Sequence, residues 1–262
     1  MLSLSHAALG YAPTVGIRAP AQNVVMETKA DLETLAGKLN PAVKFYDPLS
    51  LADAELFGSS AKAIGFLRHA EIKHGRVAMA AFVGYCVQSN GIYFPWASTL
   101  DGTTYADIAA AGSPPAQWDA VPTNAKWQIF AFIAGLELWG ECMMDKHYMA
   151  GGKPGEYPSF GPLRDEIGHP TLDLFDPFGF SKKKTPEQKE KGLLIELNNG
   201  RLAMIGIMAF VSEAKVPGAV PGLAGCNIAP YAGEVMAPWG PADTTVPLVG
   251  DMLKWVGPWG SI

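Results

Sequence analysis

The sequence predicts an all-α membrane protein with three transmembrane helices, two of which cross about a pseudo-twofold axis. The main observation is a repeat: EIKHGRVAM at Glu71 to Met79 recurs as ELNNGRLAM at Glu196 to Met204, with five of nine positions identical. Each copy heads an apolar run, Val77 to Val87 and Leu202 to Val211, and a further apolar run spans Ala125 to Met144. The 29 glycines and 21 prolines favour long structured loops between few regular elements.

The three helices are expected at about residues 60–88, 125–144 and 187–214. At 1.5 Å per residue the first is about 43 Å long, which exceeds a hydrocarbon core of ~30 Å, so it must tilt or project. The second carries Trp127 and Trp139 as interfacial anchors. Mean hydropathy is only +0.11, because charged and amide residues interrupt the runs. A hydropathy window therefore under-detects spans of this kind.

Helix geometry limits how the repeated charges can pair. Glu71 and His74 share a helix face, whereas Arg76 lies about 140° around the helix from Glu71 and cannot neutralise it. An ionised side chain at membrane depth is costly unless it is paired inside the protein. We therefore expect two reciprocal ion pairs between the copies, Glu71 with Arg201 and Glu196 with Arg76.

Small residues lie near the same helix stripes, Gly75 and Ala78 in the first copy and Gly200 and Ala203 in the second. Small side chains let two helix backbones approach closely in lipid. The repeat therefore predicts that the first and third helices cross at these residues.

The repeated carboxylates each stand beside one further donor, His74 in one copy and Asn199 in the other. No site has the three or four clustered ligands of a zinc centre. Single donors suit a metal that brings its own equatorial ligands, such as the magnesium of a chlorophyll. One copy alone would be an ordinary solvated helix face, and His74 alone an ordinary core histidine. Duplication ahead of two apolar runs favours the ligand interpretation.

The paired E-x-x-[HN]-x-R signature followed by Ala-Met resembles the first and third transmembrane helices of the light-harvesting chlorophyll-binding protein family. The resemblance implies axial ligands to chlorophyll magnesium at Glu71, His74, Glu196, Asn199 and Glu213. It implies further pigment-binding residues at Arg76, Arg201, Gln128 and Glu137.

An aromatic-Asp-Pro turn precedes each copy of the repeat, at Asp47 and Pro48 and again at Asp176 and Pro177. Proline holds the backbone extended, and the aspartate can accept hydrogen bonds from nearby amides. In the family that the chain resembles, the corresponding loops hold the polar end groups of carotenoids.

The resemblance has two departures from the green-plant pattern. Glu213 stands fourteen residues after Asn199, where the family usually has Gln. Glu213 is either a carboxylate ligand or a helix-end residue that reaches water. The long loop between the first two helices and the VMAPW stretch at Val235 to Trp239 resemble the chlorophyll a/c branch of algae with red-lineage plastids, including dinoflagellates.

Charge and composition set the orientation and the ends of the chain. No Lys or Arg occurs between Arg76 and Lys126, whereas five lysines lie in 182–191, so the positive-inside rule puts both repeat entrances on the stromal side. The tail is then lumenal, with 246–256 as a surface helix.

The N-terminal residues 1–30 are a transit segment or a flexible terminus, because the first 26 residues contain no Asp or Glu. Residues 31–262 form one membrane domain.

The resemblance implies a multi-pass protein of the plastid thylakoid that binds chlorophyll a, chlorophyll c and carotenoids of the peridinin, fucoxanthin or diadinoxanthin type. It would pass excitation to a photosystem. Its surroundings would be thylakoid lipids, a photosystem core and other antenna subunits, and it would form a homo- or hetero-oligomer.

The chain has no catalytic motif such as GxSxG or a P-loop, and His69 and His74 lack the spacing of HExxH. The net charge of -5 argues against nucleic acid, and three scattered cysteines give no disulfide framework. The alternatives are a photoprotective quencher on the same fold and a small transporter or channel.

Overall fold

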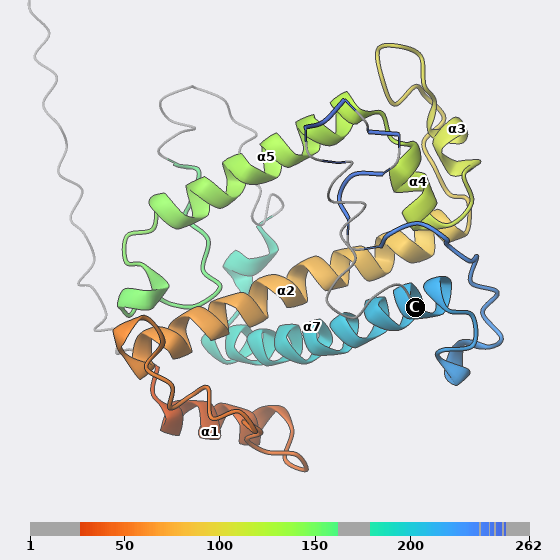
Figure 1. Ribbon diagram of the computed structural model, residues 1–262. Coiled ribbons are helices and arrows are strands. Elements are labelled where there is room, and N and C mark those ends of the chain that lie inside the picture. The colour runs from red at the N-terminus through yellow and green to blue at the C-terminus, as the bar shows by residue number, and fades with distance from the viewer. Residues whose placement is uncertain are drawn as a thin grey trace, which may run out of the picture.

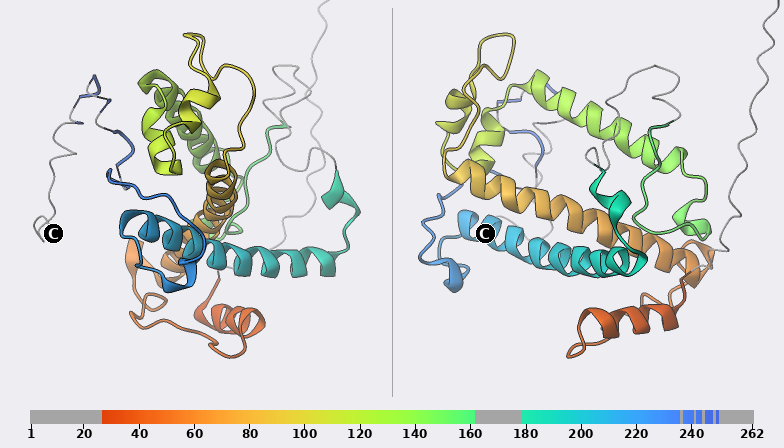
Figure 2. Two further views of the ribbon diagram at one scale, coloured as in Figure 1. Left: turned by 90° about the vertical axis from the view of Figure 1, so that its right-hand side faces the viewer. Right: turned by 180° about the vertical axis from the view of Figure 1, so that it is seen from behind.

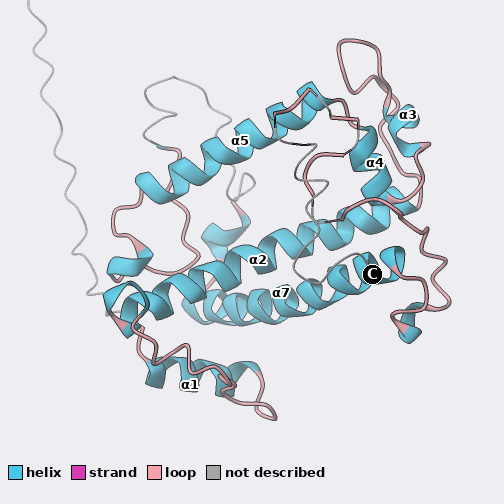
Figure 3. Cartoon of the chain, in the orientation of Figure 1, coloured by secondary structure: helices cyan, strands magenta, loops and turns pink. Residues whose placement is uncertain are grey.

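A computed structural model describes residues 27–161 and 179–235, together with positions 237–240, 242, 243, 245–247 and 249 of the tail. The described residues form helices and loops, with a single isolated β-bridge between Ala97 and Thr104 (Figure 3). Asp176, Pro177 and the tail beyond position 249 lie outside the described residues, as does most of the segment 1–30.

The α-helices are α1 (Lys29–Leu39), α2 (Ser60–Ser89), α3 (Tyr105–Ala109), α4 (Pro114–Ala120), α5 (Thr123–Cys142) and α7 (Pro186–Lys215). Short 3-10 turns are η1 (Leu56–Gly58), η2 (Tyr148–Ala150), η3 (Phe180–Lys183) and η4 (Pro221–Leu223).

The three long helices α2, α5 and α7 lie within two residues of the bounds that the apolar runs predict. Local chemistry explains the start of α7, where Thr185 and Gln188 form a capping box and Pro186 occupies the first turn. Short helices in two loops were not foreseen: α3 and α4 between α2 and α5, and α1 ahead of α2.

By length and composition, one helix of the described residues, α7, passes as a candidate membrane span, with a window of mean hydropathy 1.3. Charged residues interrupt the apolar runs of α2 and α5. Hydropathy therefore does not count these two helices as spans.

The helices α2 and α7 pack side by side and cross at two glycines (Figures 1 and 2). A Cβ added at Gly75 would lie 3.1 Å from the Cα of Gly200, and one added at Gly200 would lie 2.9 Å from the Cα of Gly75. Further along, the rings of Phe82 and Phe210 stack at 5.0 Å, and Phe82 fills the space above Gly206. The crossing predicted from the small residues is therefore present, with contact between the two backbones.

The helix α5 stands apart from the crossed pair along most of its length (Figures 1 and 2). Its apolar side chains are left open, with Phe132 65% and Leu138 65% exposed. The crossed pair has similar outward residues, such as Val77 at 70% and Ile205 at 70%. Apolar surface on this scale is costly in water, so these helices require cover by lipid or by bound apolar groups.

Candidate functional site

Two ion pairs connect α2 and α7 on either side of the crossing. The Arg201 Nε lies 2.7 Å from the Glu71 Oε1, and the Arg76 Nε lies 2.6 Å from the Glu196 Oε1. Both reciprocal pairs predicted from the repeat are present. Each glutamate is thereby neutralised by an arginine of the opposite helix. This agrees with helix geometry, because the Glu and the Arg of one copy lie about 140° apart around their own helix.

The two pairs are not equivalent, because Glu71 has a second cation. The Arg68 Nη1 contacts the Glu71 Oε2 from one helical turn earlier, and Arg68 itself is buried. Arg76 differs in another way: its Nη1 donates to the Gly155 carbonyl at 2.7 Å, which ties the loop after α5 to α2. The sequence analysis missed Arg68, although its three-residue spacing from Glu71 is a common helical pairing.

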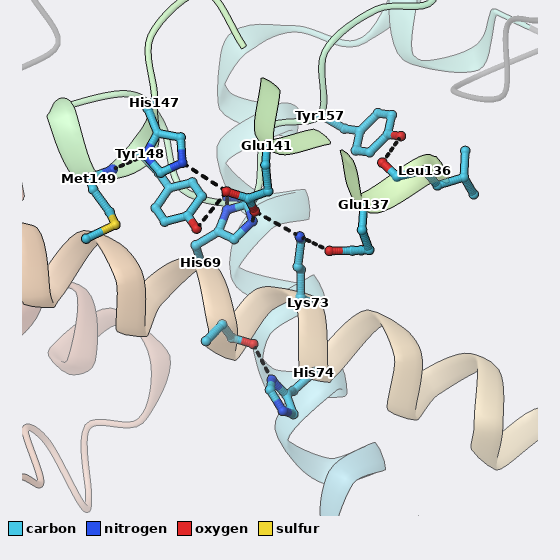
Figure 4. Close-up of polar contacts among 12 residues, drawn as sticks. His69, Lys73, His74, Leu136, Glu137, Glu141, His147, Tyr148, Met149 and Tyr157 are labelled. Atoms are coloured by element: carbon cyan, nitrogen blue, oxygen red, sulfur yellow. Dashed lines mark hydrogen bonds and ion pairs between the residues drawn. The ribbon is translucent and has the colours of Figure 1, made fainter. Parts of the chain in front are cut away.

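The imidazole of His74 is exposed and has one nitrogen engaged. Its Nδ1 lies 2.8 Å from the Ala70 carbonyl oxygen, in the preceding turn (Figure 4). Because a carbonyl can only accept, Nδ1 carries the hydrogen, and the neutral ring keeps its lone pair on Nε2. A backbone carbonyl holding the other nitrogen is the usual way in which a protein orients a histidine ligand.

Two amide side chains are similarly free. Asn199 on α7 and Gln128 on α5 are exposed, and neither makes a hydrogen bond with the described residues. The neighbouring Asn198 is used instead for structure, since it donates to the Leu39 carbonyl at 3.3 Å. The amide oxygens of Asn199 and Gln128 are therefore available to an external group.

The carboxylate of Glu137 resembles that of Glu196 in having one neutralising cation. The Lys73 Nζ of α2 lies 2.5 Å from the Glu137 Oε2 and 3.4 Å from the Glu141 Oε1 (Figure 4). The other oxygen of Glu137 has no partner among the residues that the structure describes. This link also joins the last turns of α5 to α2, a contact that the sequence analysis did not foresee.

The remaining residues of this cluster hold the loop that follows α5. The ring of Tyr148 stacks on His69 at 3.9 Å and its hydroxyl donates to Glu141 at 3.1 Å (Figure 4). The Gly155 amide donates to His69 Nδ1 at 3.1 Å. Burial and the Glu141 carboxylate raise the pKa of Tyr148 to about 12, so the hydroxyl stays a donor. Among the described residues, no group of His, Cys, Asp and Glu side chains is arranged as a protein-only metal site.

A cavity of about 970 Å³ opens beside one of the crossed pairs. Arg76 and Glu196 lie in its wall together with apolar side chains such as Ile72, Leu193 and Leu197. Its volume lies within the range of small-molecule and cofactor sites. The wall also carries several other charged side chains, among them Lys38, Lys153, Glu156 and Glu190, so the cavity suits a large group that has an apolar body and polar substituents.

The first aromatic-Asp-Pro turn has the predicted hydrogen bonds. The Asp47 carboxylate accepts from the amides of Leu51 and Ala52, each at 2.9 Å. The bonds from Ala52 and Leu51 lower the pKa of Asp47, so it is ionised at neutral pH. Pro48 follows Asp47 in the turn, and the second copy of this turn is outside the described residues.

The helix-end residue Glu213 is buried, at 9% exposure, so the alternative that it reaches water is wrong. Its carboxylate accepts from the Gly218 amide at 2.7 Å and the Val220 amide at 2.8 Å. It therefore fixes the turn after α7. The sequence analysis compared only a ligand with a solvated end residue and missed this third role.

Taken together, the fold and the site define a helical protein whose two crossed helices exchange Glu-Arg pairs and leave single donors exposed beside them. A family model described as chlorophyll A-B binding protein matches residues 31–215. The chain belongs to this chlorophyll-binding, light-harvesting family.

Several curated proteins are similar to this chain along most of its length. The fucoxanthin-chlorophyll a-c binding protein of Trieres chinensis is 30% identical over 222 residues, covering 83% of this chain and 94% of that protein. Protein F of the same name from Phaeodactylum tricornutum is 34% identical over 203 residues, covering 76% and 88%. Protein A from Macrocystis pyrifera is 33% identical over 190 residues, covering 72% and 75%. These relatives confirm the predicted chlorophyll a/c branch.

Proposed function

We propose that this chain is a light-harvesting antenna protein of the chloroplast thylakoid, which binds chlorophyll a, chlorophyll c and carotenoid and passes excitation to a photosystem. The observation that carries the proposal is the pair of crossed Glu-Arg contacts with unengaged donors exposed beside them, above all the Nε2 of His74. The relatives, which are named for chlorophyll a-c and fucoxanthin and as chloroplastic, supply the pigment types.

The proposal includes three membrane spans. Its support is the length of α2, α5 and α7, which have 30, 20 and 30 residues, and the open apolar side chains on all three. A helix of about 20 residues suffices to cross a bilayer. The glutamates at the crossing are each neutralised from the opposite helix, which assigns these charges a role in holding the helices together and weighs against the ion-path alternative.

Each of the three long helices carries residues that would bind pigment. His74 and Glu71 on α2, Asn199 and Glu196 on α7, and Gln128 and Glu137 on α5 would each hold one chlorophyll magnesium or pigment edge. Asp47, Pro48, Asp176 and Pro177 would hold carotenoid end groups. Chlorophyll, when bound, supplies the light absorption and the excited state that moves between rings. The protein orients the donors and excludes water from the apolar faces, and its surroundings would be thylakoid lipids, the photosystem core and other antenna subunits.

Replacing His74 by Leu should remove about one chlorophyll per polypeptide while the fold stays intact, because the paired charges survive. Pigment content is measured by chromatography of the complex refolded with extracted pigments. His74→Asn is the matched control, since the second copy of the repeat already uses Asn at this place, and it should keep the chlorophyll. Equal pigment content in the Leu variant and the wild type would remove His74 from the ligand set. The fluorescence lifetime of the wild-type complex separates an antenna from a quencher.

Glu213 allows a comparison of a ligand with a purely structural residue. Glu213→Gln keeps an amide oxygen, the family's usual donor, so a ligand role predicts that the Gln variant retains its chlorophyll and Glu213→Ala loses it. A purely structural role predicts equal pigment content in both variants. In that case hydrogen exchange at the amides of Gly218 and Val220 would still accelerate in the Ala variant, because both amides lose their acceptor.

A further inference from the structure

A fully enclosed ion pair joins the first turn of α5 to the carboxyl-terminal tail. The Lys126 Nζ lies 2.6 Å from the Asp243 Oδ2, and the two side chains are 0% and 1% exposed. The Asp243 carboxylate also accepts from the Thr123 hydroxyl at 2.5 Å and the Gly240 amide at 2.8 Å. Lys126 donates in addition to the Asp119 carbonyl at 3.3 Å. Both charges are therefore paired and hydrogen-bonded, which a buried pair requires.

The surroundings of Asp243 favour its ionised form. Burial by itself would raise the pKa of Asp243, but the hydrogen bonds from Lys126, Thr123 and Gly240 outweigh burial and lower it. The Asp243 carboxylate therefore stays charged to a lower pH than an ordinary aspartate.

The same tail is fixed at its other end to α7. The Tyr231 amide donates to the Ala214 carbonyl at 2.7 Å, and the Lys215 Nζ donates to the Gly233 carbonyl at 2.6 Å. The tail is therefore hydrogen-bonded to the last turn of α7 where it begins, and it runs from there toward the start of α5 (Figures 1 and 2).

Between these two ends the tail packs on α4 and α5. The Tyr231 hydroxyl donates to Asp119 at 2.6 Å, and the Trp118 indole donates to the Pro238 carbonyl at 2.9 Å. The ring of Trp239 contacts those of Trp127 at 4.8 Å and Phe130 at 5.3 Å. The tail thus bridges α7 to the start of α5 through aromatic packing and hydrogen bonds.

The rest of α5 has little support from the crossed pair. At its other end the Lys73 contacts with Glu137 and Glu141 join it to α2, and between the ends Phe132 and Ile133 are exposed. The separation of α5 from α7 is consequently set near the two ends of α5. At its start the tail acts together with α4, whose Gln117 side chain donates to the Gln88 carbonyl of α2 at 3.3 Å.

We propose that the described tail positions from Tyr231 to Val249 form a spacer between α7 and α5, and that Lys126 and Asp243 are its positioning residues. The spacer would hold Gln128, one half-turn beyond Lys126, at a fixed distance from the donors of the crossed pair. This inference rests on the proposed function, since the position of α5 controls excitation transfer only if α5 carries pigment. Resonance transfer falls steeply with distance, so a displaced α5 changes the transfer without removing any ligand.

The test uses Asp243→Asn and Lys126→Met as single variants of the full chain, with the double variant Lys126→Met/Asp243→Leu. Each single variant leaves one buried group without its charge partner, and the double variant replaces both by apolar groups, which restores a satisfied interior. Hydrogen exchange of the α5 amides should accelerate at least about tenfold in the single variants and return toward wild type in the double variant. The crossing of α2 and α7 should keep its protection.

The pigmented form supplies a second readout. The excitonic circular dichroism and the fluorescence excitation spectrum should change in the single variants and recover in the double variant. Asp53→Asn is the matched control, because it breaks the surface pair of Lys29 and Asp53, whose side chains are 42% and 55% exposed. This control should leave both readouts unchanged.

Three outcomes separate the hypotheses. Wild-type exchange in α5 of both single variants would overturn the spacer, as would an equal loss of protection across α2, α5 and α7, which would mean that the pair stabilises the whole fold. A wild-type chain that binds no pigment would overturn the proposed function, while the exchange measurement would still test the spacer.

Discussion

Replacing Arg76 by Leu is expected to abolish pigment binding on refolding, whereas replacing Arg201 by Leu is expected only to weaken it. Among the described residues Glu196 has no cationic partner besides Arg76, and the Arg76 guanidinium also holds the Gly155 carbonyl. Glu71 keeps Arg68 when Arg201 is lost. The two halves of a symmetric repeat should therefore respond unequally.

The size of the effect depends on what surrounds the pair. Without pigment or lipid the side chains of Arg76 and Glu196 are 43% and 29% exposed, and an exposed ion pair is worth at most about 1 kcal/mol. Once apolar groups cover the crossing, removing one partner leaves an uncompensated charge, for which about 3 to 5 kcal/mol is typical. The loss should therefore appear in the pigmented complex and scarcely in the bare polypeptide.

Pigment per polypeptide after refolding is the measurement for Arg76→Leu, with Arg201→Leu prepared in parallel. Full pigment content in the Arg76 variant would show that the crossed pairs do not hold the pigment-binding form. A larger loss in the Arg201 variant than in the Arg76 variant would contradict the supporting role of Arg68.

The crossing could be predicted from sequence because the motif that forms it occurs twice in the chain. A single Glu-x-x-His-x-Arg run has many interpretations, but two copies ahead of apolar runs leave each Arg without a partner in its own helix. Geometry then forces the exchange of partners that Glu71 and Glu196 show. The bounds of α2, α5 and α7 were similarly accessible, since apolar runs and prolines mark them.

Contacts between unrepeated residues were not accessible in the same way. Lys73 with Glu137 and Lys126 with Asp243 are 64 and 117 residues apart in the chain, and no local pattern joins them. Lys126 lies at the start of the helix predicted at 125–144, where nothing in the sequence marks it for burial, although it is among the most enclosed of the described side chains. Its burial depends on how the tail folds back, which is a property of the whole fold.

Glu213 shows what a family pattern leaves out. The resemblance implies a ligand there, which stays a prediction, and the structure adds a role that the pattern does not contain: the carboxylate accepts from the Gly218 and Val220 amides, five and seven residues later. A turn that closes on a helix-end carboxylate has a local signal, Pro217 and Gly218 directly after the helix, which could have been used.

Adding a side chain at the crossing is expected to be the most damaging change that leaves every charge and donor in place. A Cβ at Gly75 or at Gly200 would stand about 3 Å from the backbone of the other helix (3.1 and 2.9 Å), and backbone cannot rotate away as a side chain can. The helices must then separate or slide. Because Arg76 and Arg201 directly follow the two glycines, either movement also lengthens the reciprocal ion pairs.

Gly200→Val and Gly75→Val should therefore lose pigment binding. Each should also lower the thermal midpoint of the helical circular dichroism, because its cost in folding stability exceeds the about 1–3 kcal/mol that is typical of overpacking. Gly84→Ala on α2 and Gly192→Ala on α7 are matched controls, because a Cβ at either place meets nothing within 4 Å. These controls should be neutral or gain up to about 1 kcal/mol from helix propensity. If the valine variants bind pigment as well as the alanine controls do, the two helices do not cross in contact at these glycines, and the ion pairs must form at a larger separation than the one observed.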